Sequence, residues 1–192
     1  QPMGMSASKQ RRWRRAEILG LIEQSPLHTP RYELVDGELL VTPSPSGLHQ
    51  IGVVELICVL APYVSASRIG QVLTSPSDTE LEPETLVQPD VYVVPLAEAQ
   101  RLRRERTGRS LLLAIELLSP SSEVADRGRK RRLYQRAVPE YWIVDLRARV
   151  VERWRAQATK ADVVRDVLEW HPHGAASPLR IDLPAFFSRV HG

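Results

Sequence analysis

The chain has 192 residues, of which 43% are hydrophobic and 26% charged, and this composition suits one folded domain rather than a disordered chain. The formal net charge of +3 is too small to identify a nucleic-acid binder, and a single cysteine excludes an intramolecular disulfide. No run approaching about 18 apolar residues suggests a membrane span, no secretory signal is visible, and a cytoplasmic location is expected. Residues 1–7 are expected to be a tag or a disordered segment, and residues 8–192 a single domain.

The first elements are a helix and a hairpin. Residues 8–23 carry apolar side chains at helical spacing, and Ser-Pro and Thr-Pro pairs follow them. Two short apolar runs within residues 32–41 flank Asp36–Gly37, which is a strong signal for a two-residue turn. We therefore expect a helix followed by a β-hairpin.

A second helix is expected over residues 48–66, where apolar residues recur at helical spacing and widen into a broad stripe. The width of this stripe predicts that most of the helix, including Cys58, is buried. Ser44 or Ser46 is expected to cap its first turn.

The second half of the chain alternates strands with helical or polar segments. A polar, arginine-rich segment spans residues 98–109, and a helix is expected over residues 123–137 after the hydroxyl-rich segment 119–122. The expected strands are 70–73, 78–82, 91–94, 111–118, 141–145, 150–154, 163–168 and 179–183, with a short apolar closure at 186–187. This order predicts an α/β (α+β) fold in which helices flank a mixed sheet.

Two carboxylates stand within or directly before apolar strands, where a charged side chain has no evident role in packing. Glu116 interrupts an apolar strand, and Asp90 follows a proline at the start of another. Burying an unpaired carboxylate costs several kcal/mol, whereas two carboxylates on neighbouring strands suit Mg²⁺ or Mn²⁺, and the Leu117 carbonyl is a possible further ligand. The alternatives are a salt bridge from Glu116 to an arginine and a turn cap formed by Asp90.

Three further residues are weaker candidates. Lys130 shares a helix face with Asp126 and Tyr134, so it is either aimed at the metal site or simply paired with Asp126. Glu33 is either a cleft residue or an outward residue of the hairpin. His49 is either a cleft residue or a satisfied core histidine at the start of the second helix.

Other chemistries lack support, and the arginines offer a role in binding. No zinc-ligand spacing, phosphate-binding glycine loop or nucleophile elbow is present. Arginine clusters at 101–109 and 127–136 can neutralise phosphates, or they can be solvated surface. The DNA-backbone candidates are Arg127, Arg129 and Arg131.

These motifs, in this order, resemble the Uma-type family of putative restriction endonucleases, within the PD-(D/E)XK nuclease superfamily. The resemblance spans about residues 10–187 and rests on Tyr32 to Glu38, His49, Pro89–Asp90–Val91, Ile115 to Ser122, Asp126, Lys130, Tyr134 and Glu140 to Asp145. It implies a restriction-endonuclease-like core with an extra N-terminal helix and hairpin. It also implies that Asp90 and Glu116 are the two acidic positions of the superfamily and that Glu33 and His49 belong to the cleft.

The chain departs from the superfamily pattern at Leu118, where the usual lysine would stand, and Lys130 is the best-placed substitute. The expected function is a metal-dependent DNA endonuclease in which Asp90 and Glu116 hold Mg²⁺ or Mn²⁺. A non-catalytic nucleic-acid-binding or regulatory module, and a structural oligomer, are the alternatives. A homodimer is expected, with the C-terminal strands and Trp154 or Trp170 at its interface.

Overall fold

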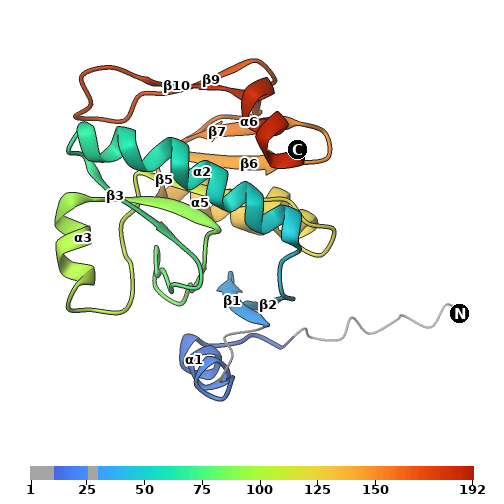
Figure 1. The fold of residues 1–192 in the computed structure, drawn as a ribbon. Coiled ribbons are helices and arrows are strands. Elements are labelled where there is room, and N and C mark those ends of the chain that lie inside the picture. The colour runs from blue at the N-terminus through green and yellow to red at the C-terminus, as the bar shows by residue number, and fades with distance from the viewer. Residues whose placement is uncertain (1–10, 26–29) are drawn as a thin grey trace, which may run out of the picture.

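The computed structural model describes residues 11–25 and 30–192, so the tag expected at residues 1–7 and the first residues of the helix expected over 8–23 lie outside the described residues. A mixed sheet forms the centre of the molecule, and helices cover both of its faces (Figure 1). The strands are β1 Arg31–Val35, β2 Glu38–Thr42, β3 Gly70–Thr74, β4 Val91–Pro95, β5 Leu113–Leu117, β6 Glu140–Asp145, β7 Val150–Arg155, β8 Asp162–Val164, β9 Val167–Trp170 and β10 Leu179–Asp182. The helices are α1 Arg15–Glu23, α2 Gly47–Ala66, α3 Leu96–Leu102, α4 Glu123–Ala125, the π-helical turn η1 Asp126–Lys130, α5 Arg131–Ala137 and α6 Leu183–His191.

The main sheet has six strands in the order β3-β4-β5-β6-β7-β8. Only β5 and β6 run parallel, and the helical segment α4–η1–α5 connects them, because parallel neighbours need a crossover. The remaining pairs in this sheet are antiparallel. The expected mixed sheet flanked by helices is therefore confirmed.

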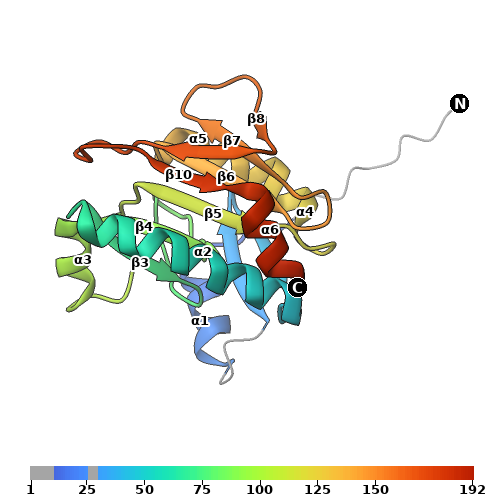
Figure 2. The same cartoon turned by 45° about the horizontal axis from the view of Figure 1, so that its top comes forward.

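Alternation along the central strands gives the sheet two apolar faces. Leu113, Ile115 and Leu117 of β5 join the core beneath α2, α6 and the β9–β10 hairpin, which lie on the same side of the sheet (Figure 2). Ala114 lies on the opposite face, in the core formed with α5 and the end of β1. Glu116 shares the parity of Ala114, so its side chain enters the α5 side of the sheet.

The β1–β2 hairpin turns at Asp36 and Gly37, whose φ values are 51° and 79°. Positive φ at both central residues is what a two-residue hairpin turn of this kind requires, so the expected hairpin is confirmed. A small third core joins α1 to the hairpin through Ile18, Leu34 and Leu86.

Helix α2 is capped by Ser46, whose hydroxyl accepts a hydrogen bond from the His49 backbone N–H, as expected. The expectation that the helix is mostly buried is wrong, because Ile51, Val54 and Cys58 are exposed on its outer side. The broad apolar stripe is wider than the face that packs on the sheet. By length and composition alone this helix could cross a membrane, but core helices of other folded proteins meet the same criterion. Its inner side packs on the sheet, and a third of the apolar window is buried.

Several expected elements have different boundaries. Residues 78–82 form no strand and contribute only isolated bridges of Thr79 to Val87 and Gly108. The strand expected over 163–168 is divided between β8 and β9, which belong to different sheets. The apolar closure is part of α6, and Trp170 is buried against Trp142, so it does not supply an exposed interface.

Candidate active site

Asp90 lies at the entrance to β4 and is held by donors from three separate elements. Its Oδ1 accepts a hydrogen bond from Arg31 at 2.8 Å. Its Oδ2 contacts His49 Nε2 at 3.0 Å and accepts the Leu117 backbone N–H at 2.9 Å. Leu117 thus offers its N–H to Asp90, which is a different role from the carbonyl ligand that the sequence suggested. A carboxylate has about four lone-pair directions, so these contacts leave about one for a further ligand.

Glu116 lies on the neighbouring strand and is only 1% exposed. Its Oε1 accepts hydrogen bonds from Lys130 Nζ at 2.9 Å and from the Tyr134 hydroxyl at 3.0 Å. Within the described part of the chain, no hydrogen bond is made to Oε2, which leaves that oxygen for another ligand. The pairing of Glu116 with an arginine, considered as an alternative, does not occur among the described residues.

Lys130 is the centre of a buried charge cluster. Its Nζ lies 2.8 Å from Glu33, 2.9 Å from Glu116 and 3.4 Å from Asp126. The π-helical turn ends at Lys130, and such a turn inside a helix is frequent at functional sites. The simple Asp126–Lys130 pair exists, but it is the longest of the three ion pairs and does not account for the lysine's position.

Glu33 and His49 both contact the segment that carries Asp90. Glu33 is fully buried, so its alternative assignment as an outward hairpin residue is wrong. Its Oε1 accepts the Gln88 backbone N–H at 2.7 Å, and this contact ties the hairpin to the segment before Asp90. His49 is buried beside Asp90, and its Nδ1 has no hydrogen-bond partner among the described residues.

The charges at this site do not balance. Four buried acids lie against two strong bases: Glu33, Asp90, Glu116 and Asp126 against Arg31 and Lys130. Burial, reinforced by the neighbouring carboxylates against the opposing effect of Lys130, raises the pKa of Glu116 well above its ordinary range. Burial also disfavours the Lys130 cation, but the surrounding carboxylates outweigh it and raise the pKa of Lys130, so this side chain stays charged.

Asp90 behaves differently from Glu116. Burial acts to raise its pKa, but the hydrogen bond from His49 and the positive charge of Arg31 hold that pKa well below the ordinary value. The two candidate carboxylates therefore have different proton affinities, because Asp90 faces cations whereas Glu116 faces other acids as well as Lys130. Divergent pKa values of neighbouring acids are frequent at catalytic sites, although structural ion pairs also produce them.

The residues fit a divalent cation such as Mg²⁺. When all four acids are ionised, they exceed the two cations by two charges, which one such ion would balance. The available atoms are carboxylate oxygens, and Glu116 Oε2 is free of hydrogen bonds in the described structure. No group of three His, Cys, Asp or Glu side chains among the described residues forms a preformed metal cage. Mg²⁺ tolerates such a site, because one or two carboxylates with water and phosphate oxygens commonly complete its shell.

The arginines proposed for DNA binding are engaged within the protein. Arg127 forms ion pairs with Glu123, Asp145 and Glu152; Arg129 pairs with Glu38; Arg131 lies over the Trp154 ring. Phosphate contacts from these three residues stay a prediction, and each contact would compete with a bond that the fold already makes.

Arg31 is the site residue that the sequence analysis missed. It is the first residue of β1, and its guanidinium contacts Ser75, the Gln88 carbonyl and Asp90. An arginine at a strand's edge is usually solvated, and nothing in its local sequence indicates a buried partner 59 positions away.

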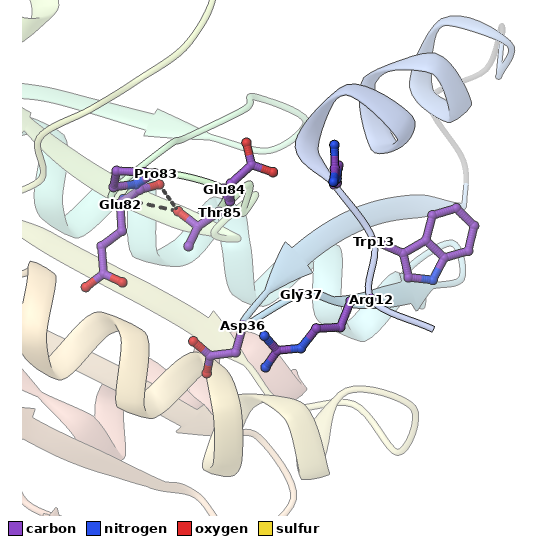
Figure 3. A pocket seen from close by; sticks show the side chains of 9 residues that line it. Arg12, Trp13, Asp36, Gly37, Glu82, Pro83, Glu84 and Thr85 are labelled. Atoms are coloured by element: carbon purple, nitrogen blue, oxygen red, sulfur yellow. Dashed lines mark hydrogen bonds between the residues drawn. The ribbon is translucent and has the colours of Figure 1, made fainter. Parts of the chain in front are cut away.

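Of the candidate site residues, those around Asp90 border a cavity. A cavity of about 220 Å³ borders Asp90, Arg31 and His49. A larger cavity of about 750 Å³ lies between the segment after residue 11, the hairpin turn and residues 82–85, where Arg12, Trp13 and Asp36 line it (Figure 3). None of the candidate site residues lines this larger cavity, so it is not part of the candidate active site.

A family model described as Uma2, putative restriction endonuclease, matches residues 21–181. The chain belongs to the Uma2 family. The family assignment made from the sequence motifs is thereby confirmed.

The fold is shared with a solved protein. The chain is similar to the crystal structure of a putative nuclease belonging to DUF820 from Anabaena variabilis ATCC 29413, with 21% sequence identity, a TM-score of 0.70, and coverage of 90% of this chain and 98% of that chain. At this identity the likeness shows the fold alone. No curated protein matches the chain.

Proposed function

We propose that this Uma2 protein is a metal-dependent DNA endonuclease whose active site comprises Asp90, Glu116 and Lys130. The observation that carries the proposal is a pair of buried carboxylates, Asp90 directly before β4 and Glu116 on the adjacent strand β5. Glu116 accepts a hydrogen bond from the buried Lys130 ammonium. Two carboxylates can hold a divalent ion for phosphodiester hydrolysis, and a lysine ammonium can stabilise the charge that develops on the phosphate. Membership of a family of putative restriction endonucleases supports a nucleic-acid substrate.

Asp90 and Glu116 would hold Mg²⁺ or Mn²⁺, which when bound supplies Lewis-acid polarisation of the phosphate and a more acidic water. Hydrolysis forms one P–O bond from the water and breaks one P–O bond to a sugar oxygen, and a proton from the water ends on that leaving oxygen. Lys130 stays a cation among its carboxylates, so it stabilises negative charge on the phosphate rather than acting as a base. Glu33 holds both the lysine and the segment before Asp90, and is a positioning residue.

The test is cleavage of supercoiled plasmid and of single-stranded DNA in Mg²⁺ and in Mn²⁺. Asp90→Asn and Glu116→Gln are expected to lower the rate at least 100-fold, with folding checked by circular dichroism. Asp162→Asn, at an exposed aspartate of β8, is the matched control and is expected to cleave like the wild type. Equal cleavage by the wild type and Asp90→Asn would reject the assignment.

A non-catalytic DNA-binding module on the same fold is the second candidate. It is favoured by Leu118 at the usual lysine position and by the three donors that already occupy Asp90. It predicts no cleavage with either metal and unchanged DNA affinity in Asp90→Asn. A homodimer and a cytoplasmic location are further proposals that size measurement and fractionation would test.

A further inference from the structure

The cavity beside Asp90 is lined by charged, polar and apolar side chains. Its volume is about 220 Å³, which is below the ~300–1,000 Å³ of typical small-molecule sites and corresponds to roughly seven water molecules at ~30 Å³ each. It therefore suits one compact planar group and not a base pair.

Two ionisable side chains of this lining, Arg31 and His49, are of the kind that binds a phosphate. The Arg31 side chain is 12% exposed and lies in contact with Asp90, and His49 lies on the other oxygen of the same carboxylate. Arginine presents several N–H donors at once, so it can keep one contact with Asp90 and offer others to phosphate oxygens. A phosphodiester entering here would meet Arg31 and His49 beside the carboxylate proposed to hold the metal.

The apolar and amide side chains of the same lining suit contact with a nucleobase. Pro43, Pro45 and Pro76 come from two separate segments, are exposed, and line the same cavity, and Val53 adds a further apolar contact. All three prolines are exposed, so burial in an apolar core does not explain their convergence. Gln50, exposed in the first turns of α2, brings an amide that can donate and accept hydrogen bonds at a base edge.

We propose that this cavity is a subsite for one unpaired nucleotide of DNA, whose base lies between the prolines and whose phosphate contacts Arg31. The inference rests on the proposed nuclease function and adds that the preferred substrate is single-stranded or locally unpaired DNA. A cavity of about 220 Å³ has room for one base and not for a stacked base pair, so a paired nucleotide would first have to leave its helix, at a cost of a few kcal/mol.

The test is a substitution that fills the cavity with a large side chain at an exposed lining residue. Gln50→Trp places an indole at the mouth without disturbing a buried position, and Val54→Trp, four residues along α2 and 55% exposed, is the matched control because Val54 does not line the cavity. The binding of a fluorescent 20-nucleotide single strand, its duplex and an abasic strand of equal length is measured by anisotropy without metal, and cleavage is measured with Mn²⁺.

We expect the wild type to bind the single strand at least 10-fold more tightly than it binds the duplex or the abasic strand. Gln50→Trp should lose that preference, whereas Val54→Trp should keep it. Gln50→Glu is nearly isosteric and adds a negative charge to the cavity lining, so it should also weaken single-strand binding. It serves as the second variant in case the indole of Gln50→Trp disturbs the helix. Equal binding of the three ligands by the wild type, or Gln50 variants that behave like Val54→Trp, would overturn the subsite.

The two proposals fail in different ways. If metal-dependent cleavage occurs but Gln50 variants do not alter strand preference, the nuclease stands and the subsite is rejected. If no metal supports cleavage while single-strand binding still depends on Gln50, the subsite stands and the nuclease assignment is rejected.

Discussion

Lys130→Met tests whether one lysine compensates the buried acids of the site. Methionine keeps the apolar stem of the side chain and removes its charge. Glu33, Glu116 and Asp126, each at most 1% exposed, would then face one another without the ammonium that lies 2.8 to 3.4 Å from all three.

The expected destabilisation is large. Removing one partner of a buried ion pair costs about 3–5 kcal/mol, because the remaining charge is uncompensated. For a chain of 150–250 residues each kcal/mol shifts Tm by about 2–4 °C, so Lys130→Met should lower Tm by about 6–20 °C at neutral pH. Adding Glu116→Gln to Lys130→Met should restore part of the loss, because one of the repelling acids becomes neutral.

Thermal unfolding of the single and double variants by circular dichroism measures both effects, with Lys160→Met at an exposed lysine as the control. A loss below about 1 kcal/mol for Lys130→Met, or no recovery in the double variant, would refute the reasoning that this cluster is buried and charge-coupled.

Two further predictions concern the scaffold. Burial opposes ionisation of Glu98, but the Arg101 hydrogen bond and two backbone N–H groups lower its pKa below the ordinary value of 4.5, so Glu98→Gln should cost about 1.5–3 kcal/mol near pH 7. Because the folded-state pKa is the lower one, that difference should shrink as pH falls below 4.5, and urea unfolding at several pH values would contradict this if the difference were constant. Gly70→Ala should be destabilising by at least about 3 kcal/mol, since a Cβ there would lie 1.9 Å from the Val94 carbonyl oxygen. Gly20→Ala, with nothing within 4 Å, should instead stabilise α1 by about 0.5–1 kcal/mol, and similar Tm values for the two variants would reject the steric argument.

The parts of the site that were predictable are those fixed by local periodicity. Alternation along β5 places Glu116 on the face opposite Leu117, and spacing of four residues aligns Lys130 with Asp126 and Tyr134. Both rules depend only on near neighbours, so they hold before the tertiary structure is known.

The parts that were not predictable depend on tertiary contacts. Arg31 and Glu33 reach the segment around Asp90 across more than 50 positions of sequence, which no local pattern records. Which side of α2 is buried is likewise decided by where the sheet lies. Val54 on the outer side is as apolar as a core residue, so the sequence alone does not show that it is exposed. Arg165 and Asp166 interrupt the apolar residues after Asp162, and the assignment of the residues on either side of this pair to two different sheets is decided by tertiary contacts.

Binding of Mn²⁺ is the most direct test that Asp90 and Glu116 form a metal site for phosphodiester cleavage. Isothermal titration of the wild type, Asp90→Asn, Glu116→Gln and the control Asp162→Asn would be run with and without a single-stranded oligonucleotide. We expect one ion per chain, at least 10-fold weaker binding in both site variants, unchanged binding in the control, and tighter binding when the oligonucleotide is present. Equal Mn²⁺ affinity in the wild type and both site variants would contradict it.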